Sequence, residues 1–182
     1  MSRVQLIDAA TTTADRRALL APIQSAFGST PAMFRAVANS PAALKSMWAA
    51  FGALGGGVIP AKLGEQIAVA VADRNACEYC LAAHTALGRK AGASADEMSA
   101  AQMGESSDPR TAAALRFALK LVEQRGQVAD GDVQALRTAG FDDEAIVEIL
   151  AHVALNLFTN YVNVAFAVPV DFPAVPLRRA AR

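Results

Sequence analysis

Residues 60–92 read PAKLGEQIAVAVADRNACEYCLAAHTALGRKAG. Apolar residues recur at three-to-four spacing on both sides of Asn75, which predicts two helices separated by a break. The first helix, residues 60–74, is apolar almost all round, so we expect it to be buried. The second is expected over residues 76–91, with Asn75 as its N-cap and Gly92 just past its end. The path of the chain at this break decides the fold.

The same helical spacing continues through nearly all of the 182 residues, and no segment alternates convincingly between apolar and polar residues. The chain is therefore predicted to be all-α. Several helix starts carry capping signals. The caps expected from these signals are Ser40 and Asp108, each followed by proline, Ser94 with Glu97, and Asp142.

We expect one helical domain over residues 1–168, followed by a C-terminal segment over residues 169–182. That segment contains three prolines and three arginines. Proline cannot continue a helix. The segment is therefore expected to be either an extended arm packed on the domain or a disordered tail.

Composition limits the classes of partner. Apolar residues make up 53% of the chain, and Lys plus Arg and Asp plus Glu both number 17, so the net charge is zero. This balance argues against a nucleic-acid or membrane-surface partner. The first 15 residues lack the apolar core of a secretory signal, and no apolar run reaches about 18 residues without polar interruption. We therefore expect a cytoplasmic protein, in which a lone CxxC pair is more often redox-active or metal-binding than structural.

Cys77, Cys80 and His84 form the candidate reactive cluster. The chain has only two cysteines and two histidines, and helical positions three and four apart lie on one face. The Cα atoms of residues three apart are separated by about 5 Å, which a disulfide tolerates. The two thiols can therefore cycle between dithiol and disulfide, with His84 placed to accept the proton of Cys80. The helix dipole, in contrast, favours Cys77 as the more acidic thiol.

Glu65 is the fourth candidate. It precedes Cys77 by twelve residues, which is about 18 Å along one continuous helix. A break near Asn75 lets the two helices fold antiparallel and brings Glu65 towards His84. A carboxylate there would orient the imidazole and take part in proton transfer. The alternative is that Glu65 only complements the start of its own helix.

Other interpretations of the cluster are weaker. Both cysteines can be inert core residues, since free cysteine is often buried. A structural zinc site needs four ligands, and this stretch offers three plus Glu65 at best. Haem attachment requires CxxCH, whereas residue 81 is leucine. We therefore expect no metal and no cofactor.

Polar and aromatic residues outside the cluster receive structural interpretations. His152 lies in an apolar helix and is expected to be a hydrogen-bonded histidine of the core or an interface. Three asparagines recur on one helix face; they can line a pocket, but we favour hydrogen bonds across a subunit contact: Asn156, Asn160 and Asn163. Three aromatic residues are expected in the core rather than in a substrate pocket: Trp48, Phe51 and Phe158.

The pattern Glu65-x11-Cys77-x2-Cys80-x3-His84 resembles the core motif of the alkylhydroperoxidase D family, within the carboxymuconolactone decarboxylase-like superfamily. Residues 31–41 look like the lead-in helices of that family. Residues 156–172, an asparagine-rich helix followed by Asp-Phe-Pro, look like the closing segment of its peroxidase-related branch.

The resemblance implies a compact all-helical fold that assembles into homo-oligomers, with active sites near subunit contacts. It implies that Cys80 attacks a hydroperoxide and that Cys77 condenses with the resulting sulfenic acid to form the disulfide. His84 and Glu65 would then relay protons. A thiol or lipoyl-type compound would be the reductant. Tyr79 departs from the best-studied branch, which has a histidine there and couples to a lipoyl-bearing reductant.

From the sequence we therefore predict an alkyl hydroperoxide reductase-like thiol peroxidase. Its partners would be a hydroperoxide, a reductant and further copies of itself, without nucleic acid or membrane. The first alternative is a general disulfide oxidoreductase or a thiol redox sensor. The second is a non-enzymatic oligomeric binding protein in which the CxxC pair is vestigial.

Overall fold

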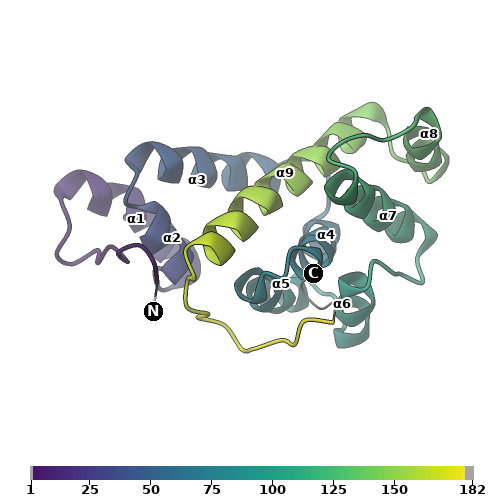
Figure 1. Ribbon diagram of the computed structural model, residues 1–182. Helices are drawn as coiled ribbons and strands as arrows, with labels where there is room; N and C mark the ends of the chain where they lie inside the picture. Colours follow the sequence, from purple (N-terminus) through teal and green to yellow (C-terminus); the bar gives the residue numbers. More distant parts are fainter. Residues whose placement is uncertain (1, 179–182) are drawn as a thin grey trace.

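The computed structural model describes residues 2–178, and all regular structure in that range is helical, as predicted. Figure 1 shows α9 crossing the molecule diagonally, with α1–α3 on one side of it and α6–α8 on the other. The helices of the described range are α1 (Ala14–Phe27), α2 (Ala32–Val37), α3 (Pro41–Gly55), α4 (Ala61–Arg74), α5 (Glu78–Lys90), α6 (Ala95–Gln102), α7 (Pro109–Glu123), α8 (Asp130–Thr138) and α9 (Asp143–Ala165).

Helix α4 is the central element of the fold. Every residue from Gln66 to Asp73 is buried, because α4 packs against α5, α6, α7 and α9 on its different sides. A helix surrounded in this way has no solvent face, which explains its nearly uninterrupted apolar sequence. The predicted buried helix is confirmed.

The turn between α4 and α5 reverses the chain, but its residues differ from the prediction. Asn75 is the C-cap of α4, and Ala76 adopts a left-handed φ of 52°. The Cys77 N–H then donates to the carbonyl of Ala72 over 2.9 Å. Helix α5 therefore begins at Glu78, with Cys77 as its N-cap. The prediction of Asn75 as N-cap was wrong because an alanine in the left-handed region gives no sequence signal.

The other predicted helix starts agree with the structure. Each cap side chain accepts a hydrogen bond from the backbone N–H three residues later, and Ser94 with Glu97 forms both bonds of a capping box. The confirmed caps are Ser40, Ser94, Asp108 and Asp142. Helix α5 ends at Lys90, with Gly92 at a φ of 90° just beyond it.

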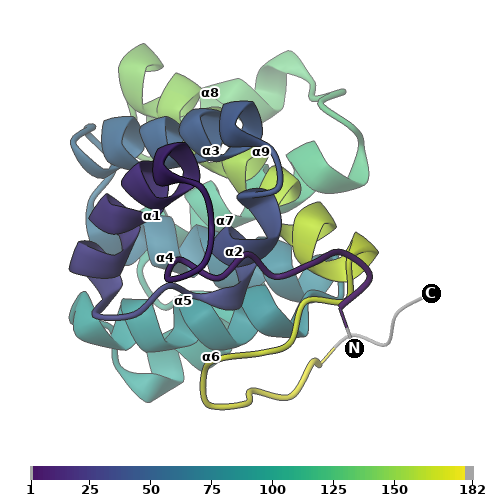
Figure 2. The ribbon, with the colours of Figure 1, turned by 90° about the vertical axis from the view of Figure 1, so that its left-hand side faces the viewer.

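Residues 169–178, called here the C-terminal arm, run along the helices without regular structure. Figures 1 and 2 show the arm leaving the end of α9 and passing α5 towards α6. Gln102 Nε2 on α6 donates to the Pro176 carbonyl over 2.9 Å, and the Arg178 N–H donates to Asp73 over 2.9 Å. The arm therefore packs on the domain through residue 178. Residues 179–182 lie outside the described range, and the division after residue 168 stays a prediction.

Helix α9 is the one helix of the described range that is long and apolar enough to cross a membrane, judged by length and composition alone. It contacts α3, α4 and α7 in this fold. It also buries three asparagine side chains among the other helices.

Candidate functional site

Cys77 and Cys80 lie at the start of α5 and form a disulfide, with their Cα atoms 5.4 Å apart. This separation agrees with the one expected for helical residues three apart. Cys77 Sγ also accepts a hydrogen bond from the Cys80 N–H over 3.2 Å, so the sulfur itself caps the helix. The residues are 1% and 2% exposed. Access to the sulfur atoms therefore depends on the cavities around them.

The two cysteines line different spaces. The Cys80 cavity is a small, mostly apolar space of about 40 Å³. Its walls come from α1, α2, α3, α5, α9 and the C-terminal arm, and they include Phe27, Met33, Phe34, Phe51, Leu87 and Phe172. The Cys77 groove is larger, about 190 Å³, and lies between the start of α5 and the end of α9. The disulfide thus separates an apolar cavity from a wider groove.

Glu65 and His84 meet across the α4–α5 hairpin. Glu65 Oε2 lies 2.7 Å from His84 Nδ1, although the residues are 19 apart in sequence. The side chains are 23% and 13% exposed, so water reaches this pair only in part. His84 also lines the Cys80 cavity, which places the imidazole between the carboxylate and that cavity. The expected approach of Glu65 to His84 is confirmed, and the catalytic roles of both residues stay predictions.

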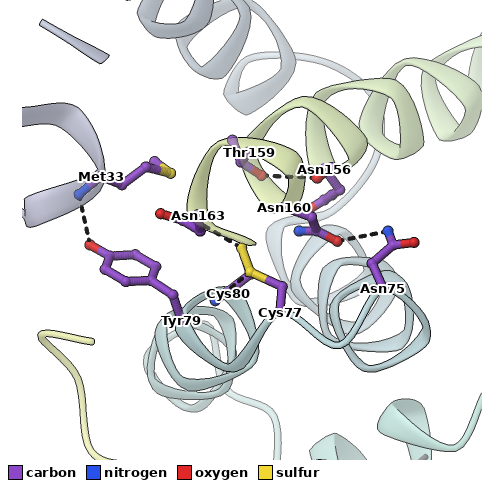
Figure 3. The surroundings of a disulfide bond; sticks show 9 residues. All are labelled: Met33, Asn75, Cys77, Tyr79, Cys80, Asn156, Thr159, Asn160 and Asn163. Carbon is purple, nitrogen blue, oxygen red and sulfur yellow. Dashed lines mark hydrogen bonds between the residues drawn. A yellow bond between two sulfur atoms is a disulfide. The ribbon is translucent and has the colours of Figure 1, made fainter. Parts of the chain in front are cut away.

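Asn163, on α9, is a neighbour of the sulfur that sequence reasoning assigned to a different role. Its Nδ2 donates a hydrogen bond to Cys80 Sγ over 3.2 Å, as Figure 3 shows. Its Oδ1 is buried and has no hydrogen-bond partner among the described residues. Asn163 also lines the Cys80 cavity. The repeat of asparagines on α9 was the signal that could have identified it.

The other two asparagines of α9 also make their contacts within the chain. Asn160 Oδ1 accepts a hydrogen bond from Asn75 Nδ2 over 2.9 Å, and Asn156 Nδ2 donates to the His152 carbonyl over 2.9 Å. Asn156, Asn160 and Asn163 are 6%, 0% and 4% exposed. Side chains buried this deeply inside one chain cannot reach a second subunit. The predicted role across a subunit contact was therefore wrong.

Tyr79 connects the site to the C-terminal arm. Its hydroxyl donates to Asp171 Oδ2 over 2.9 Å and accepts from the Met33 N–H over 3.4 Å. The Ala32 N–H donates to the same Asp171 oxygen over 2.5 Å. Phe172 packs edge-on against the Tyr79 ring, with ring centroids 5.7 Å apart. Burial, reinforced by the Asp171 charge, raises the pKa of Tyr79 above its usual range, so the phenol stays protonated.

His152, on α9, lines a third cavity of about 160 Å³ together with Glu65 and His84. Its Nε2 is buried without a hydrogen-bond partner in the described range, so the expected hydrogen-bonded histidine was wrong. Burial lowers the pKa of His152. No three His, Cys, Asp or Glu side chains within residues 2–178 are placed to hold a metal ion.

The three aromatic residues expected in the core have different positions. The rings of Trp48 and Phe34 pack edge-on, with centroids 5.7 Å apart. Phe51 packs against the core, as expected, and also lines the Cys80 cavity. Phe158 is 38% exposed, and its assignment to the core was wrong.

The sequence matches the model of the carboxymuconolactone decarboxylase family over residues 41–124. That range contains α3 to α7 and all four candidate residues of the hairpin. A comparison with curated proteins gave no match.

Several solved structures share the fold. The first, from Ralstonia eutropha JMP134, is described as an alkylhydroperoxidase AhpD core and an uncharacterized peroxidase-related protein. It is 28% identical, with a TM-score of 0.83, and covers 93% of this chain and 92% of its own. An uncharacterized peroxidase-related protein from Silicibacter sp. TM1040 is 25% identical, with a TM-score of 0.82 and coverage of 92% and 91%.

The third structure is the debrominase Bmp8 in complex with 2,3,4-tribromopyrrole. It is 20% identical, with a TM-score of 0.76 and coverage of 93% and 90%, and this likeness concerns the fold alone. The family match, the two peroxidase-related structures and the Glu–CxxC–His hairpin agree with one another. These findings together support the assignment of the chain to the alkylhydroperoxidase D-like proteins of the carboxymuconolactone decarboxylase family.

Proposed function

We propose that this chain is a thiol peroxidase that reduces organic hydroperoxides through a Cys80–Cys77 dithiol–disulfide cycle. One observation carries the proposal. His84 is held by Glu65 at 2.7 Å and lines the same apolar cavity as Cys80. A nucleophile and a base therefore line one space suited to an apolar substrate, and a carboxylate outside that space orients the base.

The first step oxidises the sulfur and reduces the peroxide. The Cys80 thiolate attacks the terminal oxygen of ROOH, an S–O bond forms, and the O–O bond breaks. The leaving alkoxide takes the proton that His84 received from the thiol and departs as ROH. Cys80 is left as a sulfenic acid.

The second step closes the disulfide. Cys77 attacks Cys80 Sγ, the S–O bond breaks, and the hydroxyl leaves as water with the proton of the Cys77 thiol. The Cα separation of 5.4 Å allows this bond without movement of the helix start. An external dithiol then reduces the disulfide and is itself oxidised. The net reaction converts ROOH and a dithiol into ROH, water and a disulfide.

Glu65 supports the imidazole in both proton transfers. A carboxylate 2.7 Å from Nδ1 favours the tautomer with hydrogen on Nδ1, which leaves Nε2 free as the base. It also stabilises the imidazolium that forms when His84 takes the thiol proton. The N-terminus of α5 adds to the stabilisation of a Cys80 thiolate.

The test is peroxide consumption with thiol counting. Reduced wild-type protein given one equivalent of tert-butyl hydroperoxide should lose two thiols and release one equivalent of alcohol. A Cys77→Ser variant should stop at a sulfenic acid that dimedone traps, and a Cys80→Ser variant should consume no peroxide. Survival of both wild-type thiols under these conditions contradicts the proposal.

The Cys77 groove favours a second candidate, a general disulfide oxidoreductase. A thiol substrate can approach the disulfide from this groove without entering the Cys80 cavity. The same preparation distinguishes the two functions. Catalytic exchange with a disulfide substrate, without peroxide consumption, would select the oxidoreductase.

A further inference from the structure

We infer that Asn163 is a catalytic residue whose amide binds both reactants. Its Nδ2 holds the Cys80 sulfur, and its Oδ1 receives the O–H of the hydroperoxide. This inference rests on the proposed peroxidase function. It assigns a role to the one polar side chain of the Cys80 cavity that contacts the sulfur directly.

The nitrogen end of the amide favours the thiolate. Cys80 is 2% exposed, and apolar surroundings disfavour a charged thiolate. The Asn163 N–H, 3.2 Å from Sγ, offsets this effect because a thiolate accepts hydrogen bonds more strongly than a neutral sulfur. Asn163 is therefore placed to increase the fraction of Cys80 that can attack a peroxide.

The oxygen end of the amide lacks a partner. Asn163 is 4% exposed, and its Oδ1 is buried with no hydrogen bond to any described residue. Leaving a buried carbonyl without a partner destabilises a protein, so such groups are rare and need an explanation. In Figure 3 this oxygen points away from the sulfur, on the side of Met33, which also lines the Cys80 cavity. A bound molecule with a hydrogen-bond donor is the missing partner.

A hydroperoxide carries one such donor, the O–H of its terminal oxygen. Other polar groups of the cavity have different roles: the Thr159 hydroxyl already donates to the Asn156 carbonyl over 3.1 Å, and His84 supplies the proton for the leaving oxygen. The terminal O–H is therefore left for Asn163 Oδ1. Because the same amide holds Sγ, this bond places the oxygen to be attacked beside the nucleophile.

The contact is compatible with the whole first step. When Sγ attacks the terminal oxygen, that oxygen keeps its hydrogen and becomes the hydroxyl of the sulfenic acid. The O–O bond breaks, and the other oxygen leaves as the alcohol with the proton from His84. The sulfenic hydroxyl still donates to Asn163 Oδ1 until Cys77 displaces it as water.

The contributions of the nitrogen and the oxygen of the Asn163 amide can be distinguished by measuring two reaction rates of Cys80 on the same protein. In a Cys77→Ser background, alkylation of Cys80 by iodoacetamide depends on the thiolate alone, whereas oxidation by tert-butyl hydroperoxide also depends on peroxide binding. Asn163→Leu should slow alkylation at pH 7 about tenfold. It should slow peroxide oxidation by at least about a hundredfold, since both ends are lost.

Asn156→Leu is the matched control, because it removes another buried amide from the same helix face without a contact to sulfur. It should leave both rates unchanged. Asn163→Asp tests the nitrogen end with a side chain of the same shape. It keeps an acceptor oxygen but loses the donor, so its alkylation should require a higher pH than the parent protein. Circular dichroism checks that each variant is folded.

Each outcome decides one part of the inference. If Asn163→Leu changes neither rate, Asn163 has no catalytic role. Equal loss in both rates overturns the contact with peroxide and leaves only the contact with sulfur. If the parent protein alkylates normally but reacts with no hydroperoxide, the proposed function fails and the peroxide contact fails with it. The alkylation rates then still decide whether Asn163 activates the sulfur.

Discussion

Replacing Phe172 by alanine should widen the Cys80 cavity and relax its selectivity among hydroperoxides. The cavity measures only about 40 Å³, which is little more than the space of one or two water molecules. Phe172 forms part of its wall from the C-terminal arm and packs on the ring of Tyr79. A bulky aromatic hydroperoxide therefore cannot enter unless this wall moves, whereas a compact one needs less displacement.

The magnitude follows from the burial of the ring. Replacing a fully buried phenylalanine by alanine lowers the free energy of unfolding by about 3–5 kcal/mol. Because Phe172 is only partly buried, we expect Phe172→Ala to lower the free energy of unfolding by about 2 kcal/mol. A pocket contact of this size changes discrimination between related substrates by roughly tenfold. The ratio of kcat/KM for cumene hydroperoxide to that for tert-butyl hydroperoxide should therefore rise about tenfold.

The assay follows consumption of each hydroperoxide with dithiothreitol as reductant, together with urea unfolding of the same samples. Phe166→Ala is the matched control, since Phe166 is 37% exposed and does not line the Cys80 cavity. It should leave the ratio unchanged. A folded Phe172→Ala protein with the wild-type ratio would show that the arm does not limit access to Cys80.

Three further predictions concern the relay, the phenol and the surface. Glu65→Gln removes the carboxylate facing His84 and should lower kcat/KM for peroxide about a hundredfold; an unchanged value contradicts the relay. The raised pKa of Tyr79 contributes stability that is present below about pH 10 and is lost as pH rises further. Between about pH 9 and pH 11, the free energy of unfolding should therefore fall less for Tyr79→Phe than for the wild type. An equal fall in both proteins would refute this prediction. Exposed apolar residues on α9, among them Tyr161 at 61%, are available for contacts between subunits of the expected homo-oligomer. Tyr161→Glu should therefore dissociate the oligomer, as measured by analytical ultracentrifugation. A wild-type protein that sediments as a monomer would refute this prediction.

Local signals were enough to predict most of the helical framework. Ser40 and Asp108 cap their helices as expected because the side chain and the N–H groups it binds are three residues apart. The approach of Glu65 to His84 was predictable for a related reason. A hairpin of two helices joined by a short turn leaves few ways to place residues on the facing sides.

Contacts between distant segments were not predictable from spacing. Asp171 reaches Tyr79 from 92 residues away, and nothing in either neighbourhood indicates the pairing. Asn163 was recognised as a polar residue on an apolar helix, but its direction depends on how α9 packs against α5. Ala76 shows the limit at short range, because its left-handed backbone is set by the reversal of the chain rather than by its own preference.

The four residues of the predicted relay, Glu65, Cys77, Cys80 and His84, lie in or at the start of two consecutive helices, whereas most walls around Cys80 come from remote parts of the chain. In the proposed peroxidase, the relay is therefore encoded in one stretch, and most of the walls, with Asn163, are encoded in others. Substitutions in α1–α3 or in the arm can reshape what enters without altering the sulfur chemistry. The residues that line the Cys80 cavity can therefore be exchanged, by design or in evolution, while the α4–α5 hairpin stays unchanged.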